Sequence, residues 1–304
     1  MLVFLLFGLF LFNQISCHQQ TIKPDFLFKN QVNNNLSIKR EFPKRRWEKR
    51  SLGIVLTAKS ALVVDEKSGK ILYQKNSKEE LPLASLTKLM TALVILDNNP
   101  DWDKVVQIKK QDQVGGASLP LYPGDKAKLK DLFSASLVSS TNNSLMAVVR
   151  SLNISQEEFV HQMNQKAIDL GLNHTHFVEP TGLDPKNVST AEDIAFLFKE
   201  AISHPELERI LLLKEYRFKL VNNSREIIAK NTDKLLDSFL NKGEYRIKGG
   251  KTGYLIEAGY CLVVEASKNN HSVISVILGS QSLEKRFQET KGLVVWAFDN
   301  YQWK

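Results

Sequence analysis

The sequence is poor in the residues that build disulfide frameworks and metal centres. It contains two cysteines, Cys17 and Cys261, and six histidines scattered through 304 residues. Two distant cysteines give no disulfide framework, and Cys261 lies in the apolar run "GYCLVVEA", which is typical of a buried strand. No zinc-ligand or P-loop spacing occurs in the chain. We therefore expect neither a metal nor a cofactor.

Long apolar runs are missing too, apart from one stretch at the N-terminus. The composition, 43% hydrophobic and 24% charged, is that of an ordinary globular protein. The run "MLVFLLFGLFLF" is shorter than the roughly 20 residues that cross a bilayer, and it predicts an export signal or signal anchor over residues 1–17. It lacks a preceding basic segment, and Cys17 suggests a lipoprotein cleavage site, so cleavage, lipidation and retention as an anchor stay open. We expect an exported protein, periplasmic or at the cell surface, with membrane association through this segment as one option.

Most of the chain also lacks a charge excess of either sign, although the formal net charge is +8. Seven basic and two acidic side chains between residues 39 and 50 supply most of that excess. The remainder is nearly balanced, so no nucleic-acid partner is expected. Residues 18–53 are rich in Asn, Gln and these charges. We predict a flexible basic linker there, whose basic end can contact anionic lipid or wall polymer.

The periodicity of the remaining chain predicts one folded domain over residues 54–304. Two strand patterns flank a hairpin signal at residues 67–69, and further strand patterns precede a helical C-terminal end. Residues from about 97 to 205 are mostly helical in pattern, with Ser155 and Ser189 as expected N-caps. Strands at both ends with helices between them predict an α/β fold of the α+β type. We expect a mostly antiparallel sheet flanked by helices, with an inserted helical lobe.

One polar pair interrupts the apolar run "LPLASLTKLM". Ser85 and Lys88 lie three residues apart, and the following apolar residues repeat at helical spacing. Ser85 is therefore predicted to cap a buried helix, with Lys88 on the same face. A helix N-terminus favours negative charge on the serine oxygen, and burial lowers the pKa of a lysine. The pair is typical of a nucleophile and its base, although the spacing is common by chance and lysine stems often lie on apolar surface.

Two further polar clusters stand out later in the chain. Ser140 and Asn142, in "LVSSTNNSL", interrupt a helical pattern, either as an interhelical turn or as part of a cleft. In "IKGGKTGYLIEAG", Lys251, Thr252 and Gly253 follow two glycines where a strand begins. An ammonium, a hydroxyl and bare backbone side by side can bind a carboxylate. The alternative is a glycine-rich strand entry with a solvated lysine.

Taken together, Ser-x-x-Lys, Ser-x-Asn and Lys-Thr-Gly in this order resemble the motifs of the penicillin-recognising serine enzymes. Over about residues 55–301 the chain is similar to the low-molecular-mass D-alanyl-D-alanine carboxypeptidases of serine peptidase family S11. The stretches that carry this similarity include "PLYPGDKAKLKDL", "HFVEPTGLDPKNVSTAEDIA" and "KNTDKLL". The resemblance implies a β-lactamase/DD-transpeptidase-like fold. It also implies a cell-wall enzyme that removes the terminal D-alanine from peptidoglycan stem peptides and is inhibited covalently by β-lactams.

The resemblance implies a role for each residue of the first two motifs. Ser85 would attack the carbonyl between two D-alanines and form an acyl-enzyme, with Lys88 as the base. Ser140 would relay protons to the leaving group. Asn142 would hold both the substrate and the lysine.

The third motif and one arginine would bind the other end of the substrate. Lys251 and Thr252 would meet the terminal carboxylate, and the amides of Ser85 and Tyr254 would form the oxyanion hole. Arg286, in "EKRFQET", falls where the family places an arginine for the same carboxylate. Its alternative is an ordinary surface charge on a helix.

Several departures from the family pattern leave other functions open. Leu255 replaces a threonine, and Asn143 and Ser144 replace Asp-Ala, so substrate preference is open. We expect no C-terminal β domain in the sequence up to Lys304. The stretch "FVEPTGL" also resembles the DD-endopeptidases, which cleave cross-links. Glu179 resembles the loop glutamate of β-lactamases, but the Leu-Asn ending of that loop is missing. A non-catalytic wall-binding module is disfavoured because it would need none of the polar clusters.

Overall fold

The computed structural model describes residues 42–49, 51 and 53–303. The predicted signal over residues 1–17 and most of the predicted linker lie outside the described residues. Within those ranges, no helix combines the length and the apolar character needed to span a bilayer. Lys44 and Arg45, at the basic end of the predicted linker, form a short strand that pairs with Tyr301 and Gln302. The C-terminal end of the domain thus holds this basic segment.

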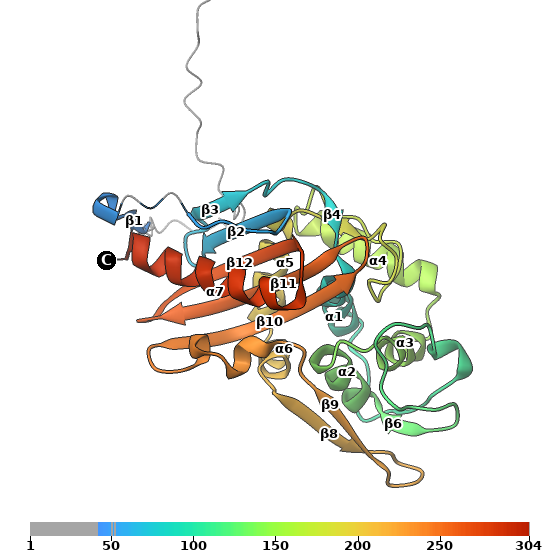
Figure 1. Ribbon diagram of the computed structural model, residues 1–304. Coiled ribbons are helices and arrows are strands. Elements are labelled where there is room, and N and C mark those ends of the chain that lie inside the picture. Colours follow the sequence, from blue (N-terminus) through green and yellow to red (C-terminus); the bar gives the residue numbers. More distant parts are fainter. Residues whose placement is uncertain (1–41, 50, 52, 304) are drawn as a thin grey trace, which may run out of the picture.

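A five-stranded antiparallel sheet forms the centre of the molecule (Figure 1). Its strand order is β10-β11-β12-β2-β3, so strands from both ends of the domain lie side by side. The bounds are β2 Ser60–Asp65, β3 Ile71–Lys75, β10 Tyr245–Leu255, β11 Gly259–Lys268 and β12 His271–Ser280. The predicted hairpin at residues 67–69 connects β2 to β3, with Gly69 at a φ of +71°. This architecture confirms the predicted α+β fold.

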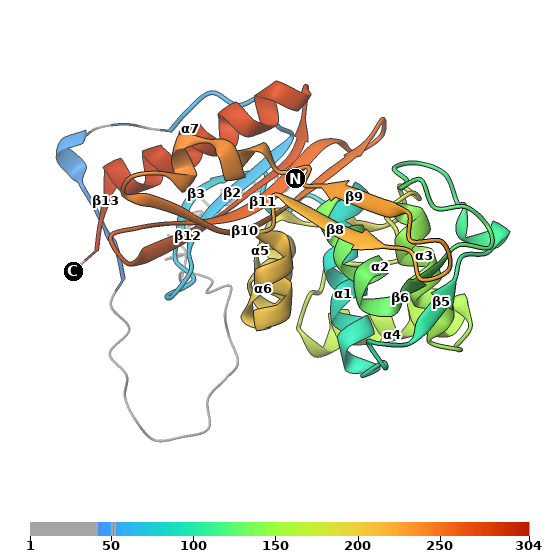
Figure 2. The same cartoon turned by 90° about the horizontal axis from the view of Figure 1, so that it is seen from below.

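Both faces of the sheet are covered by helices. Helix α7, Leu283–Asn300, crosses one face, and α5, Ala191–Ser203, packs on the other (Figures 1 and 2). Every residue of β2 is buried. This explains why the central strands read as continuous apolar runs rather than alternating ones. Each face therefore has its own hydrophobic core.

The helical lobe lies beyond one end of the sheet (Figure 2). Its main helices are α1 Lys88–Asp97, α2 Leu129–Val138, α3 Asn142–Ser151 and α4 Gln156–Asp169. The short helix α6, Pro205–Leu211, follows α5 and packs against β10. The 3₁₀ helices are η1 Trp47–Lys49, η2 Ala84–Thr87, η3 Lys110–Asp112, η4 Lys234–Asp237 and η5 Phe239–Asn241.

Four short ladders complete the described structure. The strands β8 Glu215–Lys219 and β9 Glu226–Lys230 form a hairpin separate from the central sheet, beside α2. The other pairs are β1 Lys44–Arg45 with β13 Tyr301–Gln302, β4 Leu81–Pro82 with β7 Val188–Ser189, and β5 Val105–Gln107 with β6 Lys126–Lys128.

The two predicted N-caps differ in outcome. The Ser155 side chain accepts the backbone N–H of Glu158 and caps α4, as predicted. The cap predicted at Ser189 is wrong, because Thr190 caps α5 by accepting the N–H of Asp193. Ser189 instead belongs to β7 and pairs with Leu81. Ser189 and Thr190 are adjacent and both carry a hydroxyl, so the sequence pattern does not indicate which of them is the N-cap.

Candidate active site

Ser85 lies at the junction between a strand and the first long helix. It belongs to the 3₁₀ helix Ala84–Thr87, and α1 begins at Lys88. The predicted capping role of Ser85 is therefore wrong, since Thr87 occupies the N-cap position of α1, although its side chain makes no capping hydrogen bond. Ala84 has a φ of +47°, a conformation that is uncommon for a residue with a side chain. The turn that carries Ser85 is thus a backbone conformation that the surrounding structure has to enforce.

Two glycines enforce that turn by close backbone contact. A Cβ on Gly182 would lie 2.0 Å from the Ala84 carbonyl oxygen. A Cβ on Gly253 would lie 2.9 Å from the Leu83 carbonyl oxygen and 3.1 Å from the Ser85 nitrogen. Only residues without side chains allow these segments to approach so closely. Strand β10 therefore lies directly beside the Ser85 amide.

The Lys88 amine contacts three oxygens. Its Nζ lies 3.0 Å from Ser85 Oγ, 2.7 Å from Asn142 Oδ1 and 2.6 Å from the carbonyl oxygen of Thr181. The side chain is fully buried. Desolvation lowers the pKa of Lys88 to about 7, against the opposing effect of the Glu179 carboxylate. The amine can therefore lose its proton near neutral pH.

The hydrogen-bond partners allow Lys88 to act as a neutral amine. Asn142 Nδ2 donates to the Gly115 carbonyl oxygen at 2.9 Å, which turns Asn142 Oδ1 toward the lysine. Asn142 Oδ1 and the Thr181 carbonyl oxygen can only accept, so they take the two N–H bonds of a neutral amine. The remaining lone pair then faces Ser85, whose hydroxyl can donate.

A second buried lysine lies on strand β10. Lys251 Nζ donates to Ser140 Oγ at 2.6 Å and to the Thr252 carbonyl oxygen at 3.1 Å. Desolvation lowers the pKa of Lys251 well below its usual value, and the charges of Lys88 and Arg286 lower it further. Ser140 has a φ of +59° in the turn between α2 and α3. The second motif is therefore both an interhelical turn and part of the cleft.

Arg286 is buried and points at strand β10. Its side chain is 5% exposed, and Nη1 donates to the carbonyl oxygens of Gly253 at 2.9 Å and Cys261 at 3.3 Å. The guanidinium lies over the ring of Tyr260, which stacks on Tyr254 with 4.3 Å between ring centroids. These contacts exclude the surface-charge alternative.

These residues surround one cleft of about 420 Å³. Lys88 and Lys251 lie buried beneath it, through their contacts with Ser85 and Ser140. Of the nine residues named from the sequence, seven line the cleft directly: Ser85, Ser140, Asn142, Thr252, Gly253, Tyr254 and Arg286.

A family match agrees with this geometry. The model of the D-alanyl-D-alanine carboxypeptidase family, serine peptidase family S11, matches residues 48–282. The chain belongs to this family. Its members are hydrolases, and the three motifs of the cleft all lie inside the matched region.

Relatives with two different activities resemble the chain to the same degree. It is 32% identical to the D-alanyl-D-alanine carboxypeptidase DacF of Bacillus subtilis, over 84% of this chain and 65% of the relative. It is also 32% identical to a D-alanyl-D-alanine endopeptidase of Pseudomonas aeruginosa, over 79% of this chain and 77% of the relative. The chain thus spans just under two thirds of that carboxypeptidase and about three quarters of that endopeptidase.

Solved structures of related proteins share the fold. Penicillin-binding protein D2 of Listeria monocytogenes, with cefotaxime bound, superimposes with a TM-score of 0.70 at 31% identity, covering 82% of this chain and all of that one. The Streptomyces K15 DD-transpeptidase gives a TM-score of 0.75 at 26% identity, again covering 82% of this chain and all of that one.

The sequence did not single out two polar residues, one in the cleft and one behind β10. Thr232 Oγ1 lies 2.6 Å from Thr252 Oγ1. Asp233 is 3% exposed behind β10, and desolvation raises its pKa to about 6. A Cβ on Gly250 would lie 2.3 Å from Asp233 Oδ2. Both residues fall in the family-like stretch "KNTDKLL", but only the fold places that stretch against β10.

Glu179 has a structural role that differs from that of a β-lactamase base. Its carboxylate accepts the backbone N–H groups of Thr181 at 2.7 Å, Gly182 at 2.5 Å and Leu183 at 2.9 Å. Asn187 Nδ2 donates to it at 2.8 Å. These donors already engage both carboxylate oxygens. Glu179 therefore folds the loop that presents the Thr181 carbonyl to Lys88.

Proposed function

We propose that the chain is a serine D-alanyl-D-alanine carboxypeptidase that forms an acyl-enzyme on Ser85. The observation that carries this function is the buried Lys88 amine, whose two fixed acceptors leave its lone pair for the Ser85 hydroxyl. The substrate is a peptidoglycan stem peptide that ends in D-Ala-D-Ala.

In the acylation step, Ser85 Oγ attacks the carbonyl carbon between the two D-alanines, and its proton moves to Lys88 Nζ. The amides of Ser85 and Tyr254 stabilise the oxyanion, an interaction worth about 3–4 kcal/mol per donor in a serine protease. The C–N bond then breaks, and the proton held by Lys88 passes through Ser140 to the leaving amine, which restores the neutral lysine. The products are free D-alanine and an ester on Ser85.

The basic groups at one end of the cleft would bind the free carboxylate at the end of the substrate. Thr252 and Arg286 line the cleft, and Lys251 lies beneath Ser140. A carboxylate at this end of the cleft favours the protonated form of Lys251 beside Arg286 and can accept hydrogen bonds from Thr252 and Lys251.

In the deacylation step, water enters from the side that the amine has left. The water oxygen attacks the ester carbonyl and gives a proton to Lys88, the ester C–O bond breaks, Lys88 returns the proton to Ser85 Oγ, and the shortened peptide leaves with a new carboxylate. A β-lactam would acylate Ser85 in the same way, but its amine stays tethered, which slows the entry of water. The related Listeria protein, solved with cefotaxime bound, supports β-lactam binding at this cleft.

A DD-endopeptidase is the second candidate, because the Pseudomonas endopeptidase is as similar as the Bacillus carboxypeptidase. Both activities share the acylation of Ser85 and differ in the amine that leaves. Either substrate is part of the cell wall, so the protein acts outside the cytoplasm. Residues 1–17 would then serve as the export signal or anchor.

The two activities can be separated with defined substrates. The full chain, purified in mild detergent, is incubated with a pentapeptide ending in D-Ala-D-Ala and with cross-linked muropeptide dimers. Mass spectrometry should show release of D-alanine from the pentapeptide. Faster cleavage of the dimers would establish the endopeptidase instead, and cleavage of neither would refute both. A fluorescent penicillin should label the wild type at Ser85, and labelling that survives Ser85→Ala would refute the assigned nucleophile.

A further inference from the structure

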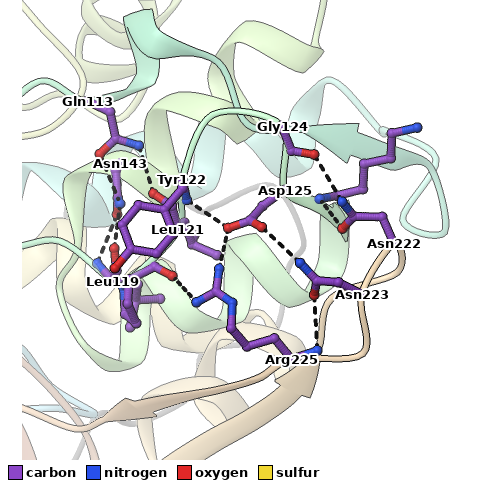
Figure 3. A network of polar contacts seen from close by, with 12 residues as sticks. Gln113, Leu119, Leu121, Tyr122, Gly124, Asp125, Asn143, Asn222, Asn223 and Arg225 are labelled. Carbon is purple, nitrogen blue, oxygen red and sulfur yellow. Dashed lines mark hydrogen bonds and ion pairs between the residues drawn. The ribbon is translucent and has the colours of Figure 1, made fainter.

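The turn of the β8–β9 hairpin holds a loop at the rim of the cleft (Figure 3). We call residues 220–225 the hairpin tip and residues 113–125 the cleft loop. The Val221 N–H donates to the Lys126 carbonyl oxygen at 2.7 Å, and the Lys126 N–H donates to Asn222 Oδ1 at 3.0 Å. Asn222 Nδ2 donates to the Gly124 carbonyl oxygen at 3.2 Å. The hairpin tip thus binds the backbone of Gly124, at the outer end of the cleft loop, and of Lys126, which follows the loop.

Arg225 adds charged contacts at three points of the cleft loop. Its Nη1 donates to the Pro120 carbonyl oxygen at 2.6 Å, and its Nη2 pairs with Asp125. The guanidinium also lies over the Tyr122 ring, 5.1 Å from its centroid. Asp125 is 7% exposed and accepts the Tyr122 N–H at 2.7 Å. Removal of the arginine would leave a buried carboxylate without its cation, which is costly.

Asn143 holds the inner end of the same loop. Its Oδ1 accepts the Leu119 N–H at 3.1 Å, and its Nδ2 donates to the Leu119 carbonyl oxygen at 2.8 Å. The side chain is 1% exposed. The amide therefore pairs with Leu119 as a neighbouring strand would. An aspartate has the same shape but no N–H to donate.

Asn143 Nδ2 also donates to Gln113 Oε1 at 3.4 Å, and between Gln113 and Leu119 the cleft loop touches Asn142. The Gly115 carbonyl oxygen accepts from Asn142 Nδ2 at 2.9 Å, and the Ala117 carbonyl oxygen accepts the Asn142 N–H at 2.7 Å. A Cβ on Gly116 would lie 2.6 Å from Asn142 Nδ2. The position of the cleft loop therefore fixes which way the Asn142 amide faces, and Lys88 donates to the other side of that amide.

We propose that Arg225, acting through Asp125, and Asn143 form a clamp that positions the cleft loop, and through Asn142 the amine of Lys88. The three clamp residues act through Asn142 and are positioning residues. The inference rests on the proposed function, because it assigns the clamp to the acylation of Ser85.

The test compares Arg225→Ala with Arg217→Ala in the full chain. Arg217 lies on the same hairpin and forms exposed ion pairs with Glu215 and Glu226, so it is a matched control. We measure the rate of acylation by a fluorescent penicillin from pH 6 to 10. Arg225→Ala should acylate at least about 10-fold more slowly, since small displacements of a catalytic group cost up to about 10²-fold. Arg217→Ala should react like the wild type.

The pH profile separates positioning from a general loss of structure. A displaced cleft loop admits water to Lys88, while Glu179 and Lys251 keep their places. The low-pH limb of the acylation profile should therefore move to higher pH in Arg225→Ala. Arg225→Lys should recover part of the rate, because an ammonium can pair with Asp125 but cannot also reach Pro120 in the same fork geometry.

Asn143→Asp tests the inner end with a side chain of equal size. This variant should acylate more slowly, and the low-pH limb of its profile should move to higher pH, as in Arg225→Ala. The clamp would be overturned if both Arg225→Ala and Asn143→Asp had the acylation rate and the low-pH limb of the wild type. A slower rate with an unmoved limb, matched by an equal loss of folded protein in thermal unfolding, would also overturn it. A wild-type chain that penicillin does not acylate would refute the proposed function itself.

Discussion

Glu179 and Lys88 are linked through the backbone of a single residue, Thr181. The Glu179 carboxylate accepts the Thr181 N–H at 2.7 Å, and the Thr181 carbonyl oxygen accepts from Lys88 Nζ at 2.6 Å. One glutamate therefore organises the loop that fixes the lysine, and its charge opposes the loss of basicity that burial causes in Lys88.

Replacement of Glu179 by glutamine should damage this loop. Glutamine offers one acceptor oxygen and turns an NH₂ group toward backbone N–H donors, so the free energy of unfolding should fall by about 1–3 kcal/mol. Acylation should slow as well, because the Thr181 carbonyl loses its support. Urea unfolding and penicillin acylation measure the two effects. Glu79→Gln, at an exposed position, is the control, and equal stability of the two variants would contradict this role.

Arginine substitutions should separate the roles of the two buried lysines. Lys88→Arg keeps the charge but cannot lose its proton, so acylation should fall by something like the 10²- to 10⁴-fold that general-base catalysis contributes. Lys251→Arg should be milder, because a guanidinium can still bind a carboxylate. Both side chains are almost fully buried, so the steric cost is similar in the two variants. Near wild-type acylation in Lys88→Arg together with an inactive Lys251→Arg would reverse the assigned roles.

The rate of acylation should depend on pH through Lys88. Its pKa is lowered to about 7 by desolvation, and only the deprotonated amine can accept the Ser85 proton. The rate should therefore be low in acid, reach half its maximum near pH 7 and level off above it. Stopped-flow acylation from pH 5 to 10 measures the midpoint. A midpoint near the ordinary lysine value of about 10.4 would show that burial does not tune this amine.

Glu265 should make stability depend on pH. Desolvation raises its pKa to about 7, so the folded state binds the proton more tightly than the unfolded state does. Its stabilising contribution is complete below the unfolded pKa and is lost as pH rises through about 7. Glu265→Gln should therefore be more stable than the wild type at pH 8 and close to it at pH 4, as measured by urea unfolding. We expect the free energy of unfolding of Glu79→Gln to differ from that of the wild type by the same amount at both pH values. The same result for Glu265→Gln would rule out this titration.

The sequence predicted the fold class and the members of the site because both leave local signals. Apolar periodicity marks strands and helices, and the polar pair of Ser85 and Lys88 stands out in an apolar run. Arg286 could not be assigned from its helical stretch alone. Its burial depends on the packing of α7 against β11, which no local pattern encodes.

Long-range contacts account for what the sequence did not reveal. Thr181 contributes a backbone carbonyl, which any residue type could supply, so its contact with Lys88 has no side-chain signature. In the sequence, Asp233 comes after a strand pattern, as a solvated turn residue would. In the structure it lies behind β10. The separate β8–β9 hairpin was predicted among the strands of one sheet, because strand periodicity does not specify which strand pairs with which.

The pairing of β12 with β2 has a consequence for biosynthesis. The two strands meet through contacts such as Ile274 with Val64, so the sheet cannot close until ribosomes have made nearly the whole domain. Such distant pairings fold slowly, because loop-closure entropy must be overcome before they form. Strand β10 and helix α7 complete the cleft, and both come late in the chain. A nascent or partly translocated polypeptide therefore contains Ser85 long before the cleft around this residue can form. Ser85 should become a reactive nucleophile only in completely folded molecules.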